Sequence, residues 1–127
     1  MKKLFISCPM KNRSEENIRM TFNRLHKIAE AVYGESLEVI PTYIEDNPPK
    51  CRTEELWYLG KSIELLSQAD YFIGICGDNA FQYNGCTVES DVAKLYGVPV
   101  YLVPTVFSAP DVAKAELVYN GTGKLID

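Results

Sequence analysis

Histidine and cysteine, the usual ligands of a zinc site, are sparse in this sequence. There is one histidine, His26, and the four cysteines (Cys8, Cys51, Cys76 and Cys86) form no C-x-x-C pair. These spacings exclude the common zinc motifs and argue against a Cys/His catalytic pair. We therefore expect no bound metal, and we expect reduced thiols in a cytoplasmic protein.

Glycine-rich phosphate-binding loops are also missing. Neither G-x-G-x-x-G nor a P-loop lysine motif occurs, so a dinucleotide or P-loop triphosphate site is unsupported and we expect no cofactor. The net charge of −4 offers no electrostatic attraction to nucleic acid or to an anionic membrane. No apolar run approaches the roughly 20 residues that span a bilayer. The apolar stretch after two amino-terminal lysines stops at Pro9, before the roughly 7–15 residues of a signal peptide's central region.

What the sequence does contain is an alternation of apolar and amphipathic stretches. Its 127 residues, 46% of them hydrophobic and 24% charged, suffice for one domain, residues 1–127, with one core. Apolar runs predict strands at residues 3–8, 37–40, 71–76 and 98–103, and Pro104 ends the last run. We expect an α/β fold: a single-domain, doubly wound parallel sheet, flavodoxin- or Rossmann-like, of about four to five strands with helices on both faces.

Capping residues and helical spacing predict the helices between these strands. Ser14, followed by two glutamates, begins the first helix, and Gly34 ends it. The apolar positions of the second helix, which Thr53 begins, are Leu56, Leu59, Ile63 and Leu66. A turn at 84–85 opens a third helix that ends at Gly97, and a last helix runs from 109 to about 119.

Glu89 is the first candidate for chemistry, because it stands at the start of the third helix, after a strand and a loop. In a parallel sheet, ligands bind where loops and helix starts lie at the carboxyl ends of strands. With the cap at Asn84, Cys86 or Thr87, Glu89 lies in the first turn, where the helix dipole favours its ionised form. An ionised carboxylate there suits a glycosyl-transferring nucleophile. The alternative is an acid that only complements the dipole.

Helical periodicity also predicts which side of the third helix is buried. Val88, Val92 and Leu95 form the expected core stripe. Glu89 falls on the neighbouring stripe with Ala93 and Tyr96, so we expect it beside the core and not on the far solvent side.

Two loops are further candidates for ligand contacts. The first strand ends in Ser7 and Cys8, and the loop after it has the basic residues Lys11 and Arg13, which with backbone N–H groups suit an anion. The loop at 77–84 combines aromatic rings with amides, which suits a planar heterocycle. The alternative for the first loop is a solvated charged loop that binds nothing. The alternative for the second is an exposed connection.

Several short motifs follow one another along residues 3–103. A first strand ends in a turn of small residues and proline. An L-x-x-A-D segment then precedes an apolar strand. After that strand come a Gly, a Glu, an Ala and a Gly-x-Pro segment. In this chain the motif residues are Leu66, Ala69, Asp70, Gly85, Glu89, Ala93, Gly97 and Pro99. In order and spacing the chain resembles the nucleoside 2-deoxyribosyltransferase superfamily, especially its short bacterial and phage branch, which is related to nucleotide N-glycosidases.

The resemblance implies cleavage or transfer at the N-glycosidic bond of a (deoxy)nucleoside or nucleoside 5′-monophosphate. Glu89 would be the nucleophile at the anomeric carbon, and the glycosyl group would pass to another base or to water. The substrate contacts implied in the same way are Ser7, Cys8, Pro9, Met10, Lys11, Arg13, Ser62, Gly77, Asp78, Tyr83, Asn84 and Gly85. A homo-oligomer, a dimer or higher, is also implied, with segment 104–127 completing a neighbouring site.

Two positions depart from the pattern of active family members. Those members commonly have an aspartate on the second helix where this chain has Ser62, and a serine cannot act as a carboxyl acid. A second aspartate, shortly before the nucleophile, is replaced by Tyr83. Two hypotheses therefore stay open: an enzyme acting on nucleosides or nucleotides, and a catalytically impaired nucleotide-binding protein that uses the same cleft.

Overall fold

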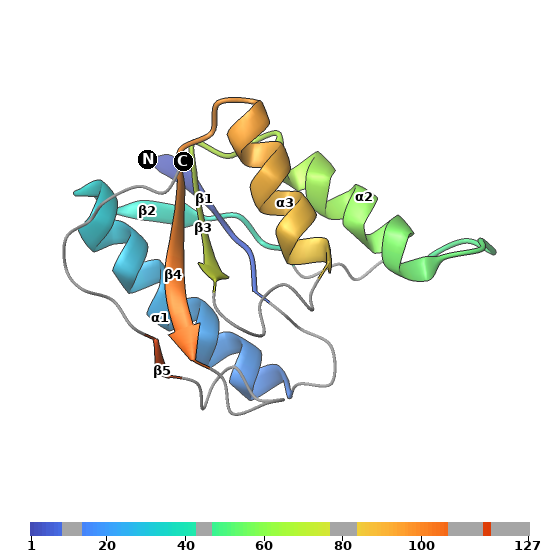
Figure 1. Ribbon diagram of the computed structural model, residues 1–127, viewed down its shortest axis with the longest axis horizontal. Helices are drawn as coiled ribbons and strands as arrows, with labels where there is room; N and C mark the ends of the chain where they lie inside the picture. Colours follow the sequence, from blue (N-terminus) through green and yellow to red (C-terminus); the bar gives the residue numbers. More distant parts are fainter. Residues whose placement is uncertain (9–13, 43–46, 77–83, 107–115, 118–127) are drawn as a thin grey trace.

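The computed structural model describes residues 1–8, 14–42, 47–76, 84–106 and 116–117. These residues form one five-stranded sheet and three helices (Figure 1). In chain order the elements are β1 (Lys2–Ile6), α1 (Glu15–Tyr33), β2 (Leu37–Val39), α2 (Glu54–Leu66), β3 (Tyr71–Cys76), α3 (Asn84–Leu95), β4 (Val100–Val106) and β5 (Glu116–Leu117).

The sheet has the strand order β2-β1-β3-β4-β5. Its first four strands are parallel, and β5 pairs antiparallel with the end of β4. The predicted α/β fold with a parallel sheet is therefore confirmed. After β1 the chain crosses to β2 on one side and then returns to β3 on the other, so the strand order reverses beside β1. In open α/β sheets, ligands bind outside the carboxyl ends of the strands at such a reversal.

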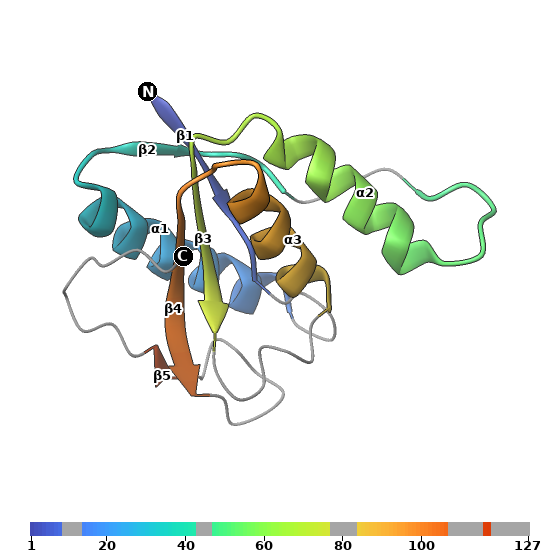
Figure 2. The ribbon, with the colours of Figure 1, turned by 45° about the horizontal axis from the view of Figure 1, so that its top comes forward.

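Each face of the sheet carries its own apolar core, because side chains alternate between the faces along a strand. Leu4 and Ile6 of β1 pack with Leu25 and Ala29 of α1. Phe5, between them, packs on the opposite face, in a cluster to which α2 and α3 also contribute. Figure 2 shows the same two layers, with α1 on one side of the sheet and α2 and α3 on the other.

The predicted ends of the first helix are confirmed. The Ser14 side chain accepts a hydrogen bond from the backbone N–H of Asn17, at 3.1 Å. Gly34 closes the helix in the left-handed conformation, with φ of 73°, and its N–H donates to the Glu30 carbonyl. Thr53 stands at the start of α2 as predicted, but its side chain makes no capping hydrogen bond.

Three local predictions are wrong. Pro104 does not end the last apolar run, because β4 continues through it to Val106 while Pro104 stands opposite Cys76 of β3. Residues 84–85 are the first residues of α3, where a turn was expected. Of the predicted last helix, the described residues Glu116 and Leu117 form strand β5, and the remainder lies outside the described residues. For β4 and β5, pairing with a neighbouring strand outweighs the local preference.

None of the described helices has the length and apolar character needed to cross a membrane.

The two helix starts give a test of capping. We expect Ser14→Ala to lower the free energy of unfolding by about 1 kcal/mol, because it leaves the Asn17 N–H without its side-chain acceptor. Thr53→Ala is the matched control, since no cap bond is lost there. Urea unfolding followed by circular dichroism measures both changes. Equal losses in the two variants would contradict the capping role of Ser14.

Candidate functional site

Glu89 lies on the buried side of α3. Its side chain is 9% exposed, and Ser90 and Ala93 are buried beside it. The prediction that Val88 and Leu95 form the core stripe is wrong, since they are 38% and 80% exposed. The helix is rotated relative to the expectation, so that a carboxylate takes a position that an apolar residue would ordinarily occupy.

The position of Glu89 along α3 also differs from the prediction. Because α3 begins at Asn84, its first turn contains no acidic residue and Glu89 lies in the second turn. Free backbone N–H groups are found only in the first turn, and the dipole effect falls off beyond it. The hydrogen-bond partners of Glu89 are instead side chains from other elements.

Ser7, directly after β1, is the first of these partners. Its hydroxyl donates to Glu89 Oε1 at 2.7 Å, and the Ser7 side chain is itself buried. The backbone N–H of Ser7 donates to the Ile73 carbonyl at 2.9 Å, which continues the pairing of β1 with β3. Alternation along β1 places Ser7 on the same face as Phe5, the face that α3 covers. The strand thus aims this hydroxyl at Glu89.

Ser62 of α2 is the second partner. Its hydroxyl also forms a hydrogen bond to the Glu89 carboxylate. The site therefore joins the end of β1 with α2 and α3, three elements that are distant in the sequence. It lies beside the carboxyl end of β1, next to the reversal of strand order.

Burial controls the protonation of this carboxyl group. It raises the pKa of Glu89 above the ordinary value of 4.5, because removal from water penalises the charged form. The hydrogen bonds from Ser7 and Ser62 oppose this effect and lower the pKa in part, since each hydroxyl stabilises the carboxylate. We expected the helix dipole to favour ionisation of Glu89. Burial and the two hydroxyl donors control its pKa instead.

Gly74 of β3 is a residue of this region that sequence reasoning missed. A Cβ added to it would lie 3.1 Å from Phe72 Cε1, 3.2 Å from Leu102 Cδ2 and 3.5 Å from the Ser7 carbonyl oxygen. The sequence does contain a signal for it, because a glycine inside an apolar strand often marks a place where a ligand or another backbone segment comes close.

Some of the other predicted site residues are described by the structure, and the rest are not. The Cys8 side chain packs in the core on the α1 face, on the other side of the sheet from Glu89. Asn84 and Gly85 begin α3, and Gly85 is exposed. The predicted contacts that lie outside the described residues are Pro9, Met10, Lys11, Arg13, Gly77, Asp78 and Tyr83.

A separate depression of about 340 Å³ lies on the α1 face. Ile6, Phe22 and Val39 line it together with Arg19 and His26. Glu89 is not among its lining residues, so it is distinct from the carboxylate site. No group of three or more histidine, cysteine, aspartate or glutamate side chains within the described ranges could hold a metal ion.

Two solved structures share the fold over 80% of this chain. One is a 2-deoxyribosyltransferase from the psychrotolerant bacterium Bacillus psychrosaccharolyticus, with a TM-score of 0.53, 18% sequence identity and 72% of its chain covered. The other is a conserved protein from Enterococcus faecalis V583, with a TM-score of 0.54, 17% identity and 62% of its chain covered. No protein-family model and no curated protein matches the sequence. The likeness establishes the fold.

The raised pKa of Glu89 predicts a pH-dependent effect of Glu89→Gln on stability. Below the ordinary carboxyl pKa, Glu89 is neutral in the folded and the unfolded chain, and the glutamine changes little. As the pH rises through the folded-state pKa, the wild-type protein alone acquires a buried charge and loses stability. We therefore expect Glu89→Gln to raise the melting temperature at pH 7 to 8 and to have little effect near pH 4.

Asp91→Asn is the control for this measurement, because Asp91 is an exposed carboxylate on the same helix. Thermal unfolding of both variants from pH 4 to 8 measures the difference. If Glu89→Gln raises the melting temperature equally at every pH, ionisation of the buried carboxyl group is not what destabilises the folded protein.

Proposed function

We propose that this protein cleaves or transfers at the N-glycosidic bond of a (deoxy)nucleoside or nucleoside 5′-monophosphate, with Glu89 as the nucleophile. The observation that carries the proposal is a buried carboxylate hydrogen-bonded by Ser7 at 2.7 Å, beside the carboxyl end of β1. A carboxylate that is short of water and held in place by hydroxyl groups is suited to attack a cationic anomeric carbon.

The fold supports the choice of substrate class. A 2-deoxyribosyltransferase shares the α/β arrangement over most of this chain, and its described use is the synthesis of nucleosides. The sequence motifs that end at Gly97 and Pro99 resemble the same superfamily. We assign the remaining substrate contacts to the segments 9–13 and 77–83, which follow β1 and β3, with Lys11 and Arg13 for a 5′-phosphate.

The reaction proceeds in two displacements. In the first, a Glu89 Oε atom bonds to C1′ of the sugar while the C1′–N bond breaks, and the electron pair leaves on the base nitrogen, which takes up a proton. In the second, a nitrogen of another base or the oxygen of water attacks C1′ and loses a proton. The C1′–Oε bond breaks, and the Glu89 carboxylate is restored.

Ser7 and Ser62 are positioning residues in this scheme. Their hydroxyl groups hold the carboxylate and favour its ionised form, which is the nucleophilic form. Neither serine can supply a proton to the leaving base as a carboxyl acid would. The position of Ser62 therefore also motivates the second candidate function, a protein that binds a nucleotide in the same cleft without turning it over.

Replacement of the nucleophile separates chemistry from binding. We expect Glu89→Ala to reduce release of free base by at least about a thousandfold, because no other group replaces the attacking oxygen. Incubation with a panel of deoxynucleosides and their 5′-monophosphates, followed by chromatography of the bases, measures the rate. Ligand-induced shifts in melting temperature should persist in the variant.

The same panel distinguishes the two candidate functions. If the wild-type protein releases no base but its melting temperature rises with ligand, the nucleotide-binding function is the correct one and the enzymatic function is wrong. A panel without turnover and without any thermal shift would reject both.

The hydrogen bond from Ser7 predicts a shift in the pH profile. Ser7→Ala removes a donor that lowers the pKa of Glu89, so that the pKa rises further. We expect the acid limb of the kcat profile to move to higher pH, with the plateau at alkaline pH retained to within about tenfold. Ser90→Ala is the control, because the Ser90 hydroxyl donates to the Thr87 carbonyl and not to Glu89. An unchanged acid limb in Ser7→Ala would argue that Glu89 ionisation does not limit the reaction.

A further inference from the structure

The hydroxyl group of Thr42 is buried and has no hydrogen-bond partner. Thr42 is 5% exposed, and within the described ranges its Oγ1 is the one buried side-chain oxygen or nitrogen that lacks a partner. A buried polar group without a partner destabilises the folded state, so native proteins contain few of them and each one calls for an explanation. No contact within the described part of the chain explains why a hydroxyl group is placed here.

Thr42 lies just beyond the carboxyl end of β2. The Ile40 N–H donates to the Leu4 carbonyl at 2.9 Å, so this edge of the sheet continues past the last residue of β2. Ile40 packs in the apolar cluster on the face that α2 and α3 cover. Leu4 is paired with Val39. Continued for three residues along each strand, this register brings Thr42 level with Ser7.

This placement puts Thr42 at the edge of the sheet where the candidate site lies. Ser7 is the residue whose hydroxyl donates to Glu89 at 2.7 Å. Strand β1 lies between β2 and β3, and the strand order reverses beside it. Ligands of open α/β sheets bind outside the carboxyl ends of the strands at such a reversal. The unpaired hydroxyl group therefore stands where a ligand is expected.

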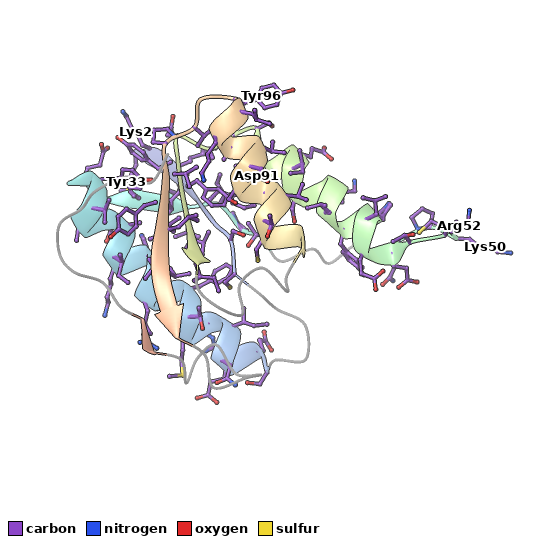
Figure 3. The ribbon with its side chains drawn as sticks, in the orientation of Figure 1. Lys2, Tyr33, Lys50, Arg52, Asp91 and Tyr96 are labelled. Atoms are coloured by element: carbon purple, nitrogen blue, oxygen red, sulfur yellow. The ribbon has the colours of Figure 1, made fainter. Side chains whose placement is uncertain are left out.

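The opposite end of the sheet shows that unpaired groups are not a general feature of this protein. Lys2 and Tyr33 mark that end in Figure 3. The Tyr33 hydroxyl donates to the Phe72 carbonyl at 2.8 Å, and the Lys3 N–H donates to the Asp70 carboxylate at 2.8 Å. Polar groups at the amino ends of the strands thus have partners within the chain, whereas Thr42 at the carboxyl ends has none.

We propose that Thr42 is a substrate-contacting residue. Its hydroxyl group forms a hydrogen bond with a polar group of the bound nucleoside or nucleotide, either a sugar hydroxyl or an oxygen or nitrogen at the edge of the base. A threonine hydroxyl can donate and accept, so it can pair with each of these groups. The contact rests on the proposed function, because it requires such a ligand beside Glu89.

The proposal has an unusual energetic consequence. The Thr42 hydroxyl is unpaired in the free protein and paired in the complex. Removing it should therefore stabilise the free protein and weaken ligand binding at the same time. A threonine that serves only the fold would not produce this pair of opposite effects.

The stability of the ligand-free protein is the first measurement. Thr42→Val keeps the branched shape and removes the hydroxyl, and we expect it to raise the melting temperature by about 2–5 °C. Thr21→Val is the matched control. Thr21 is 1% exposed, and its hydroxyl donates to the Asn17 carbonyl at 3.0 Å. The control loses a hydrogen bond and should not gain stability. A lower melting temperature in Thr42→Val would overturn the proposal, because the hydroxyl would then be satisfied in the free protein.

Ligand affinity is the second measurement. Isothermal titration calorimetry with deoxynucleosides and their 5′-monophosphates is carried out in a Glu89→Ala background, so that no turnover interferes. Adding Thr42→Val should raise the dissociation constant about five- to tenfold, whereas adding Thr21→Val should leave it unchanged. Thr42→Ser retains the hydroxyl and should keep the dissociation constant within about twofold. An affinity that Thr42→Val leaves unchanged would overturn the proposal.

Two fragments of the substrate identify the group that Thr42 contacts. The free base alone and deoxyribose 5-phosphate alone are titrated into the wild-type protein and into Thr42→Val. Weaker binding of the free base in the variant identifies the base edge as the partner. Weaker binding of the sugar phosphate identifies a sugar hydroxyl.

These measurements also separate the contact from the proposed chemistry. Base release by the wild-type protein, with an affinity that does not depend on Thr42, would reject the contact and retain the enzyme. Weaker binding in Thr42→Val, without base release by the wild-type protein, would support the contact in a nucleotide-binding protein. If no nucleoside or nucleotide binds, the contact and the proposed function are both wrong.

Discussion

The hydrogen bond from the Ser7 hydroxyl to the Glu89 carboxylate joins the end of β1 to α3 inside the protein. At 2.7 Å it links two side chains that are both almost fully buried. A carboxylate in such a position has lost most of its water, and hydroxyl donors must replace that hydration. Ser62 supplies the second donor from α2. The packing of β1, α2 and α3 thus brings two hydroxyl donors to one buried acid.

Two opposing demands meet at Glu89. Burial raises its pKa and favours the neutral acid, whereas the proposed chemistry needs the carboxylate. The two serine hydroxyl groups favour ionisation without adding a second charge beside the first. A site of this kind protects the nucleophile from solvent at some loss of folding stability at neutral pH. Such a conflict between stability and local rules is typical of functional sites.

Helix α2 links this site to the surface of the molecule. Its inner side brings Ser62 to Glu89, whereas Leu56 and Gly60 on its other side are exposed.

Local sequence determined the first four strands and the three helices of this fold, and it singled out Glu89 as a candidate. The caps at Ser14 and Gly34 and the apolar strands depend on contacts within a few residues, so they could be predicted. The buried face of α3 could not, because apolar periodicity favours Val88 and Leu95, whereas burial depends on what surrounds the helix. Only the tertiary structure brings together Ser7, Ser62 and Glu89, which are distant in the chain. Their contact, and the raised pKa that burial imposes, follow from the packing of β1, α2 and α3 and from no local pattern.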